Sequence, residues 1–282
     1  MNIRAIAIDL DHTLFNSQLE IPEKNAEAIK LTSEKGLYII IATGRMPIVL
    51  NRSLKHLLPY IDCMISYNGA MAMDVKTQEL IYAQPVPSYA CAELVSKFSS
   101  AKYNVMFFSG DRVFSRNVAQ DSILEYYVKR TGAQIELCSH REMPTEKPIH
   151  KFFFYDLEIN KHYNHALESP LETVVYNRVL QYIPTELQAV KTRLGYVECI
   201  HKDVSKFNSI DKVLSRQGMD SRKHLMAIGD GYNDIDMVKN AKLGVAVGNA
   251  VDALKKVSKM IVSDNDDAGV AEAISKTIHT KF

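Results

Sequence analysis

Short apolar runs that alternate with amphipathic segments constrain the fold of this chain more than any other feature. The runs IRAIAID (3–9), LYIIIATGR (37–45) and DCMISYNGA (62–70) are separated by segments with the spacing of helices. Continuous apolar runs indicate strands buried on both faces, and such strands alternating with helices are typical of a parallel sheet made of right-handed βαβ units. We therefore predict an α/β fold with a Rossmann-like parallel-sheet core.

Helices are predicted after the N-terminal strands, and the same alternation of strands and helices returns near the C-terminus. The first helix is predicted over 21–36, with Pro22 near its start and Gly36 at its end, and a second over 46–58. Toward the C-terminus we predict helices over 205–218, 232–241 and 252–260, with strands over 225–231, 243–250 and 261–264. These C-terminal strands are expected to complete the sheet begun by the N-terminal ones.

The middle of the chain has a different pattern. Between residues 84 and 200 the apolar runs are richer in aromatic residues and come partly in adjacent pairs, such as NVMFFSG (104–110) followed by DRVFSR (111–116). Paired runs joined at Gly110–Asp111 favour a hairpin. We therefore predict a core domain formed by 1–83 and 201–282, split by an inserted α+β domain over 84–200.

Composition narrows the possible partners and the compartment. Lys and Arg number 34 against 33 Asp and Glu, so no charge excess indicates a nucleic acid or an anionic membrane as partner. No uncharged apolar run is long enough for a membrane span. The four cysteines are far apart, which favours free thiols in a reducing compartment. We expect a cytoplasmic protein, and the sequence gives no indication of its oligomeric state.

Polar side chains stand where the predicted core strands end. In a parallel sheet the carboxyl ends of the strands form the usual ligand site. Any one such residue is explained by a helix cap or a turn, but the whole set converges at one edge. The set is Asp9, Asp11, Thr13, Thr43, Gly44, Arg45, Ser66, Asn68, Gly69, Asp230, Asn233 and Asp234, with Lys206 just ahead of a core helix. Carboxylates as close as Asp9 and Asp11 repel each other unless a cation offsets their charge.

Four of these segments resemble the motifs of a known family. DLDHTL (9–14), ATGR (42–45), VSK (204–206) and GDGYND (229–234) occur in the order of the four motifs of the haloacid dehalogenase superfamily of phosphohydrolases. The NGA at 68–70 and the position of the insert resemble the Cof-type branch, which has a large type 2 cap. One departure is His12, where the family often has glycine.

The resemblance implies a role for each motif residue. Asp9 would be the nucleophile that forms an aspartyl phosphate, and Asp11 would be the general acid and base. Lys206 would stabilise the transition state by its charge. Mg²⁺ would be held by Asp9, by Asp230 and by the backbone carbonyl of Asp11, with Asp234 orienting the metal shell. The expected contacts to the phosphoryl group or the rest of the substrate are Thr43, Gly44, Arg45, Asn68, Lys206 and Asn233.

The resemblance also implies the kind of substrate. Small phosphorylated metabolites such as sugar phosphates, pyridoxal phosphate or flavin mononucleotide are expected, with the inserted domain closing over them. Two other functional interpretations of the same residues stay open. A phosphomutase would pass the phosphoryl group to a second hydroxyl instead of water. A phospho-acceptor signalling module also uses acids, a threonine and a lysine around Mg²⁺, although such modules are about half as long and need no cap.

Overall fold

The computed structural model describes residues 2–98, 102–116, 122–131, 133–138, 147–156, 170–191 and 197–278. The chain forms two compact units. The first contains Met1–Arg45, Leu50–Ala83 and Val204–Phe282, and the second contains Met46–Val49 and Gln84–Asp203. Each unit has its own sheet and its own hydrophobic core.

The first unit is built on an eight-stranded sheet. Its strands, in order across the sheet, are β14 (Met260–Ile261), β13 (Leu243–Ala246), β12 (Leu225–Gly229), β1 (Ala5–Ile8), β2 (Tyr38–Ala42), β3 (Cys63–Ser66), β4 (Met71–Asp74) and β5 (Leu80–Ala83). The strands from β14 to β3 are parallel, and the C-terminal strands join the N-terminal ones where β12 pairs with β1. The predicted α/β class of the core is confirmed.

The far edge of this sheet differs from the purely parallel prediction. Strands β4 and β5 pair antiparallel to their neighbours. The physical reason is the length of the connection, because only the short turn Tyr67–Gly69 joins β3 to β4. A parallel partner would need a crossover of a dozen or more residues.

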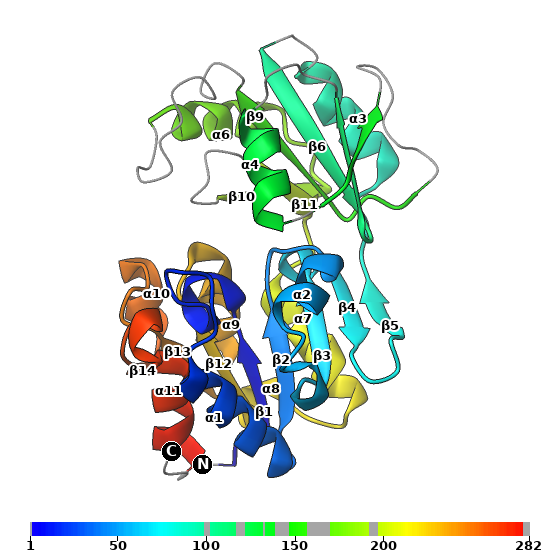
Figure 1. Ribbon diagram of the computed structural model, residues 1–282. Helices are drawn as coiled ribbons and strands as arrows, with labels where there is room; N and C mark the ends of the chain where they lie inside the picture. Colours follow the sequence, from blue (N-terminus) through cyan, green and yellow to red (C-terminus); the bar gives the residue numbers. More distant parts are fainter. Residues whose placement is uncertain are drawn as a thin grey trace. The chain divides into compact units, whose positions relative to one another are not determined.

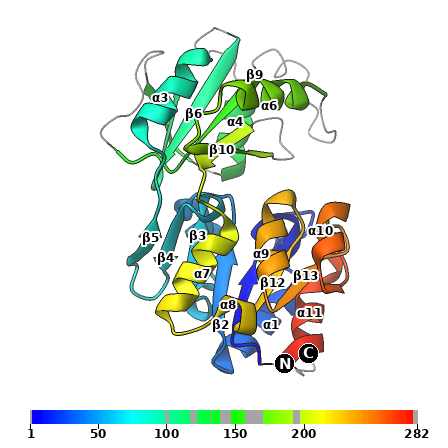
Figure 2. The same cartoon turned by 180° about the vertical axis from the view of Figure 1, so that it is seen from behind.

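Helices cover both faces of the first sheet. Helices α1 and α11 lie on one face, and α7 and α9 on the other (Figures 1 and 2). Pro22 precedes α1, and Gly36 follows it with a φ of 81°, a left-handed conformation that glycine adopts without strain. The helices that belong wholly or mainly to this unit are α1 (Glu23–Glu34), α2 (Pro47–Ser53), α7 (Lys206–Arg216), α8 (Ser221–His224), α9 (Ile235–Asn240), α10 (Asp252–Val257) and α11 (Gly269–Ile278).

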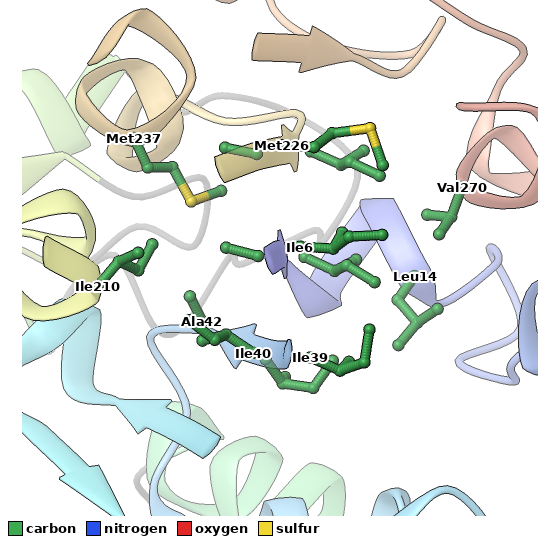
Figure 3. Packing of buried hydrophobic residues seen from close by; sticks show 14 of the residues in the cluster. Ile6, Leu14, Ile39, Ile40, Ala42, Ile210, Met226, Met237 and Val270 are labelled. Carbon is green, nitrogen blue, oxygen red and sulfur yellow. The ribbon is translucent and has the colours of Figure 1, made fainter. Parts of the chain in front are cut away.

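The core between these layers is apolar and closely filled. Ile210 of α7 and Met237 of α9 lie on one side of the central strands, and Leu14 and Val270 on the other (Figure 3). All four side chains are fully buried. Burying an aliphatic side chain of this size contributes about 1.5–3 kcal/mol, so this core holds the strand ends in fixed positions.

The second unit is an α+β structure. Its six-stranded sheet runs in the order β10 (Leu187–Lys191), β11 (Val197–His201), β9 (Lys151–Asp156), β6 (Tyr103–Ser109), β7 (Arg112–Arg116) and β8 (Ile135–Cys138). Among the strands that the structure describes in this unit, only β7 and β8 pair in parallel. The predicted hairpin at Gly110–Asp111 is confirmed as β6 and β7.

The two faces of this second sheet are covered differently. Helices α3 (Ser88–Lys97) and α6 (Pro170–Tyr182) pack on the face that carries Phe152 and Phe154. Tyr127, from α4 (Ser122–Thr131), contacts Phe108 and Phe153 on the opposite face. In the part of the chain that the structure describes, no helix has the length and apolar character needed to cross a membrane.

Candidate active site

Polar side chains that follow three neighbouring strands meet at one edge of the first sheet. Asp9 follows β1, Thr43 follows β2 and Asp230 follows β12, and these strands are adjacent in the sheet. Each of the three residues is no more than 5% exposed. The continuous apolar strands therefore carry these polar groups into a buried position.

Lys206 supplies positive charge at this edge. It is the first residue of α7, and Ser205 caps that helix by accepting a hydrogen bond from the Asn208 N–H at 3.0 Å. The Lys206 ammonium donates to Asp9 Oδ1 at 2.5 Å and to Asp234 Oδ1 at 2.6 Å. The lysine is thus fixed between two carboxylates from distant parts of the chain.

Asp234 links this lysine to the loop after β12. Its Oδ2 accepts hydrogen bonds from the N–H groups of Asp230 and Gly231, at 3.0 and 2.9 Å. Its Oδ1 accepts from Lys206. Because Asp234 is fully buried and both its oxygens have protein donors, it fixes the position of Asp230 relative to Lys206.

The carboxylates form a cluster suited to a hard cation. Oxygen atoms of Asp9, Asp230 and Asp234 all lie within 4.8 Å of one another. Thr13 Oγ1 donates to Asp230 Oδ1 at 3.1 Å, which orients that carboxylate. Three buried carboxylates face one ammonium group, and their oxygen-only donor set is the kind that Mg²⁺ prefers. The residues present therefore fit this cation.

The electrostatics agree with this interpretation. Burial, and then the negative charges of Asp234 and Asp230, raise the pKa of Asp9 well above its usual value, although Lys206 opposes the shift. Burial lowers the pKa of Lys206, but the carboxylates of Asp234 and Asp9 raise it by more, so the ammonium stays charged. A divalent cation among the carboxylates would favour ionised Asp9.

Asp11 has a different partner from Asp9. The Arg45 guanidinium donates from Nε to Asp11 Oδ2 at 2.8 Å and from Nη2 to Asp11 Oδ1 at 2.5 Å. Arg45 also lies over the Phe15 ring, with its Cζ 5.1 Å from the ring centroid. The two carboxylates of the first motif are thus held by different cationic side chains, Lys206 for Asp9 and Arg45 for Asp11.

The backbone conformation at His12 accounts for the glycine that the family often has at this position. It has a φ of 60°, within a short turn over Leu10–Leu14 that directs the chain away from β1. A non-glycine residue in this left-handed region carries strain. Asn249 Nδ2 donates to the His12 carbonyl at 2.8 Å and helps to hold the turn in this conformation.

The Tyr67–Gly69 turn brings Asn68 against two other predicted site residues. Asn233 Nδ2 donates to Asn68 Oδ1 at 3.0 Å. A Cβ atom added at Gly44 would lie 3.1 Å from the same oxygen, so Gly44 and Asn68 are immediate neighbours. Gly69, with a φ of 110°, packs so closely on Ser205 that an added Cβ would lie 2.2 Å from its carbonyl oxygen. This turn therefore joins three of the four motifs.

Sequence reasoning placed Thr13 at the end of the first strand without giving it a role, and it missed two asparagines that support the first motif. Thr13 orients Asp230, while Asn249 and Asn265 donate to backbone carbonyls in the turn after β1. The two asparagines also contact each other, since the Asn265 N–H donates to Asn249 Oδ1 at 3.0 Å. The only local signal was the position of Thr13 within the first motif, because the asparagines lie more than 200 positions away along the chain.

Comparison with known proteins points to one family. The family model of haloacid dehalogenase-like hydrolases matches residues 6–274. The 5-amino-6-(5-phospho-D-ribitylamino)uracil phosphatase YcsE of Bacillus subtilis is 26% identical over 97% of this chain and 95% of its own length. The pyridoxal phosphate phosphatase YbhA of Escherichia coli is 24% identical over 97% of this chain and 98% of its own length.

A solved structure agrees in fold. The structure of BT4131, described as a HAD subclass IIB sugar phosphatase, matches with a TM-score of 0.83 at 23% identity, and covers 98% of this chain and 99% of that one. The family match spans nearly all the described residues, including the four motifs and both units. The chain belongs to the haloacid dehalogenase-like hydrolase family, in agreement with the resemblance found in its sequence.

Proposed function

We propose that this protein is a Mg²⁺-dependent phosphatase of small phosphomonoesters that acts through an aspartyl phosphate. The observation that carries the proposal is the buried Lys206 ammonium, which bridges Asp9 and Asp234 beside Asp230. In a hydrolase family, a carboxylate paired with a fixed lysine at a buried strand end is suited to attack on phosphorus.

The first half-reaction forms the phosphoenzyme. A carboxylate oxygen of Asp9 attacks phosphorus in line with the leaving oxygen, and the bond between phosphorus and that oxygen breaks as the new bond forms. Asp11 donates a proton to the departing oxygen, so the product leaves as a neutral alcohol. Asp11 then remains as a carboxylate.

The second half-reaction restores the enzyme. Asp11 takes a proton from a water molecule, and the water oxygen attacks phosphorus. The bond between phosphorus and Asp9 breaks, which frees the Asp9 carboxylate and releases inorganic phosphate. Separate partners for Asp9 and Asp11 suit this division between attack and proton transfer.

Other residues would bind the phosphoryl group and its counter-ion. Lys206 would stabilise the charge that builds on the phosphoryl oxygens. Asp9, Asp230 and the backbone carbonyl of Asp11 would hold Mg²⁺, and Asp234 would fix the surrounding groups. When bound, Mg²⁺ supplies positive charge that offsets the carboxylates and the phosphoryl oxygens. Further contacts to the phosphoryl group are assigned to Thr43, Gly44, Asn68 and Asn233, while a direct contact from Arg45 to the substrate stays a prediction.

The second unit would act as the cap that selects the leaving group. We assign residues 84–200 to this cap and residues 1–83 and 201–282 to the catalytic core. Relatives of similar length are named as phosphatases of a phosphoribitylamino compound and of pyridoxal phosphate. These names support small, soluble phosphomonoesters as the substrate class and favour water as the final acceptor over a second hydroxyl.

The test measures phosphate release from a panel of sugar phosphates, pyridoxal phosphate and flavin mononucleotide. Each substrate is assayed with Mg²⁺ and with a chelator, using the wild type, Asp9→Asn and Asp220→Asn. Asp220 is a matched control, because it is an exposed carboxylate that caps α8, at the amino end of β12. We expect turnover that needs Mg²⁺, disappears in Asp9→Asn and persists in Asp220→Asn.

Three other outcomes would overturn the proposal. Turnover that is unchanged in Asp9→Asn would show that Asp9 is not the nucleophile. Isomerisation of a hexose phosphate, activated by a bisphosphate, would identify a mutase. A phosphorylated protein that persists for minutes without releasing phosphate would identify a phospho-acceptor module.

A further inference from the structure

Arg45 makes a two-point contact with Asp11 to which the proposed chemistry gives no defined role. Its guanidinium presents Nε and Nη2 side by side to the two oxygens of Asp11. Such a two-point contact fixes both the distance and the plane of a carboxylate, which a single hydrogen bond does not do. The Phe15 ring beneath the guanidinium, itself only 2% exposed, limits where Arg45 can move.

Both partners of this contact also start from fixed backbone. The Arg45 N–H donates to Thr43 Oγ1 at 3.2 Å, and the Arg45 carbonyl accepts from the Tyr67 N–H at 3.1 Å. The turn that carries Asp11 is closed by the hydrogen bond from the Phe15 N–H to the Leu10 carbonyl at 2.9 Å. The orientation of Asp11 is therefore set by structure on both sides of the contact.

The Arg45–Asp11 contact is more exposed than the Lys206–Asp9 contact. The side chain of Asp11 is 27% exposed, whereas that of Asp9 is 7% exposed and that of Lys206 is fully buried. Asp11 is therefore more accessible to solvent than the attacking group. A guanidinium directed at Asp11 through two donors is placed to act on proton transfer.

We propose that Arg45 is a positioning residue that acts through Asp11, orienting its carboxyl group for proton exchange with the leaving oxygen and with water. This inference rests on the proposed function, since it needs Asp11 to transfer protons. Lysine cannot replace Arg45 in this role, because an ammonium group lacks the planar fork that fixes a carboxylate at two points. In this role Arg45 acts on Asp11 and makes no contact with the phosphoryl group.

A double-mutant cycle tests the proposal. The variants are Arg45→Met, Arg45→Lys, Asp11→Asn and the double variant Arg45→Met/Asp11→Asn, assayed with p-nitrophenyl phosphate and with a sugar phosphate. The nitrophenyl leaving group needs little protonation, so variants that lack Asp11 keep measurable turnover. Thermal unfolding of each variant checks its fold, and if Arg45→Met does not fold, Arg45→Lys takes its place in the cycle.

We expect the Arg45 substitutions to lower kcat with the sugar phosphate by about 10–100-fold, because a small misplacement of a catalytic group has effects of this size. The KM and the inhibition constant of inorganic phosphate should change less than about twofold. In the Asp11→Asn background, Arg45→Met should have almost no further effect, since residues that act as one unit are not additive.

Other results of the same experiment would overturn the proposed role of Arg45. Multiplicative effects of the two substitutions, or phosphate inhibition weakened about 10-fold or more in Arg45→Met, would place Arg45 on the phosphoryl group and overturn the proposal. Full activity of Arg45→Lys would show that charge alone is sufficient and would also overturn it. Failure of the proposed function itself would look different, because the wild type would then release no phosphate or Asp11→Asn would remain fully active.

Discussion

The two units each bury a lysine against carboxylates, and the two arrangements differ in charge balance. In the second unit, Lys151 Nζ pairs with Glu198 Oε1 at 2.9 Å, and both side chains are about 5–6% exposed. The Lys151 ammonium also lies 4.8 Å from the centroid of the Phe108 ring. In the first unit, one ammonium, that of Lys206, meets a cluster of three carboxylates.

This difference separates a structural pair from a site. In the Lys151 pair, one ammonium and one carboxylate offset each other. The Lys206 cluster has more negative than positive charge and stands at the carboxyl ends of parallel strands. A buried excess of carboxylate charge is costly without a cation, which is why this cluster marks the candidate active site.

The largest difference between the two lysines should appear in turnover. Lys206→Met is expected to lower kcat by about 10³-fold or more, because it removes the charge next to the attacking carboxylate. Lys151→Met, the same chemical change in the other unit, should leave kcat within about threefold, since a buried pair inside the second sheet acts on stability. Equal losses in the two variants would contradict the distinction.

The Lys151 substitution should act mainly on stability. Lys151→Met leaves Glu198 as a buried charge without this partner, which is expected to cost about 3–5 kcal/mol in urea unfolding. The double variant Lys151→Met/Glu198→Met should recover most of that loss, because replacing a whole buried pair by apolar side chains is often neutral. A double variant as unstable as the single one would show that the pair is needed for the fold of the second sheet.

Added Mg²⁺ should stabilise the first unit and do so more strongly as pH rises. At a hundredfold excess over its Kd, the expected gain is about 2.7 kcal/mol. Burial raises the pKa of Asp9 in the cation-free protein above the value of 3.8 expected for the unfolded chain. Protonated Asp9 therefore favours the cation-free fold at low pH, and this contribution is lost as pH rises through the raised pKa. Mg²⁺ takes the place of that proton.

Scanning calorimetry with Mg²⁺ or a chelator, at about pH 5 and about pH 8, measures this linkage. The shift in Tm caused by Mg²⁺ should be larger at the higher pH. Asp230→Asn should show little shift at either pH, because it removes a carboxylate of the cluster. A shift that is the same at both pH values, or that survives in Asp230→Asn, would separate cation binding from these carboxylates.

The backbone of the first unit was largely predictable from the sequence, because its strands are continuous apolar runs. The predicted strands at 3–9, 37–45, 62–70, 225–231 and 243–250 each contain an observed strand of the parallel sheet. The helix predicted over 46–58 is shorter than expected, ending at Ser53, and β14 has only two residues. The hairpin formed by β4 and β5 was missed, since its strands are only partly buried and lack a long apolar run.

The partners within the site were less predictable than its members. Strand ends and motifs in the sequence predicted Asp9, Asp11, Arg45 and Lys206 as site residues. No local pattern indicates which carboxylate each cationic side chain binds. The Arg45–Asp11 contact joins residues 34 positions apart, and the Lys206–Asp9 contact joins residues 197 positions apart. Side-chain direction over such separations depends on packing, as the stacking of Arg45 on Phe15 illustrates.

In the proposed reaction, Asp9 and no other carboxylate accepts the phosphoryl group. The direct measurement is a rapid-quench experiment on the wild type with Mg²⁺ and its best substrate, followed by borohydride reduction of any acyl phosphate and peptide mass spectrometry. We predict that the reduced carboxyl group maps to Asp9 alone and is absent when substrate is omitted. Reduction at Asp11, Asp230 or Asp234, or phosphate release with no acyl phosphate trapped at any quench time, would show that Asp9 is not the nucleophile.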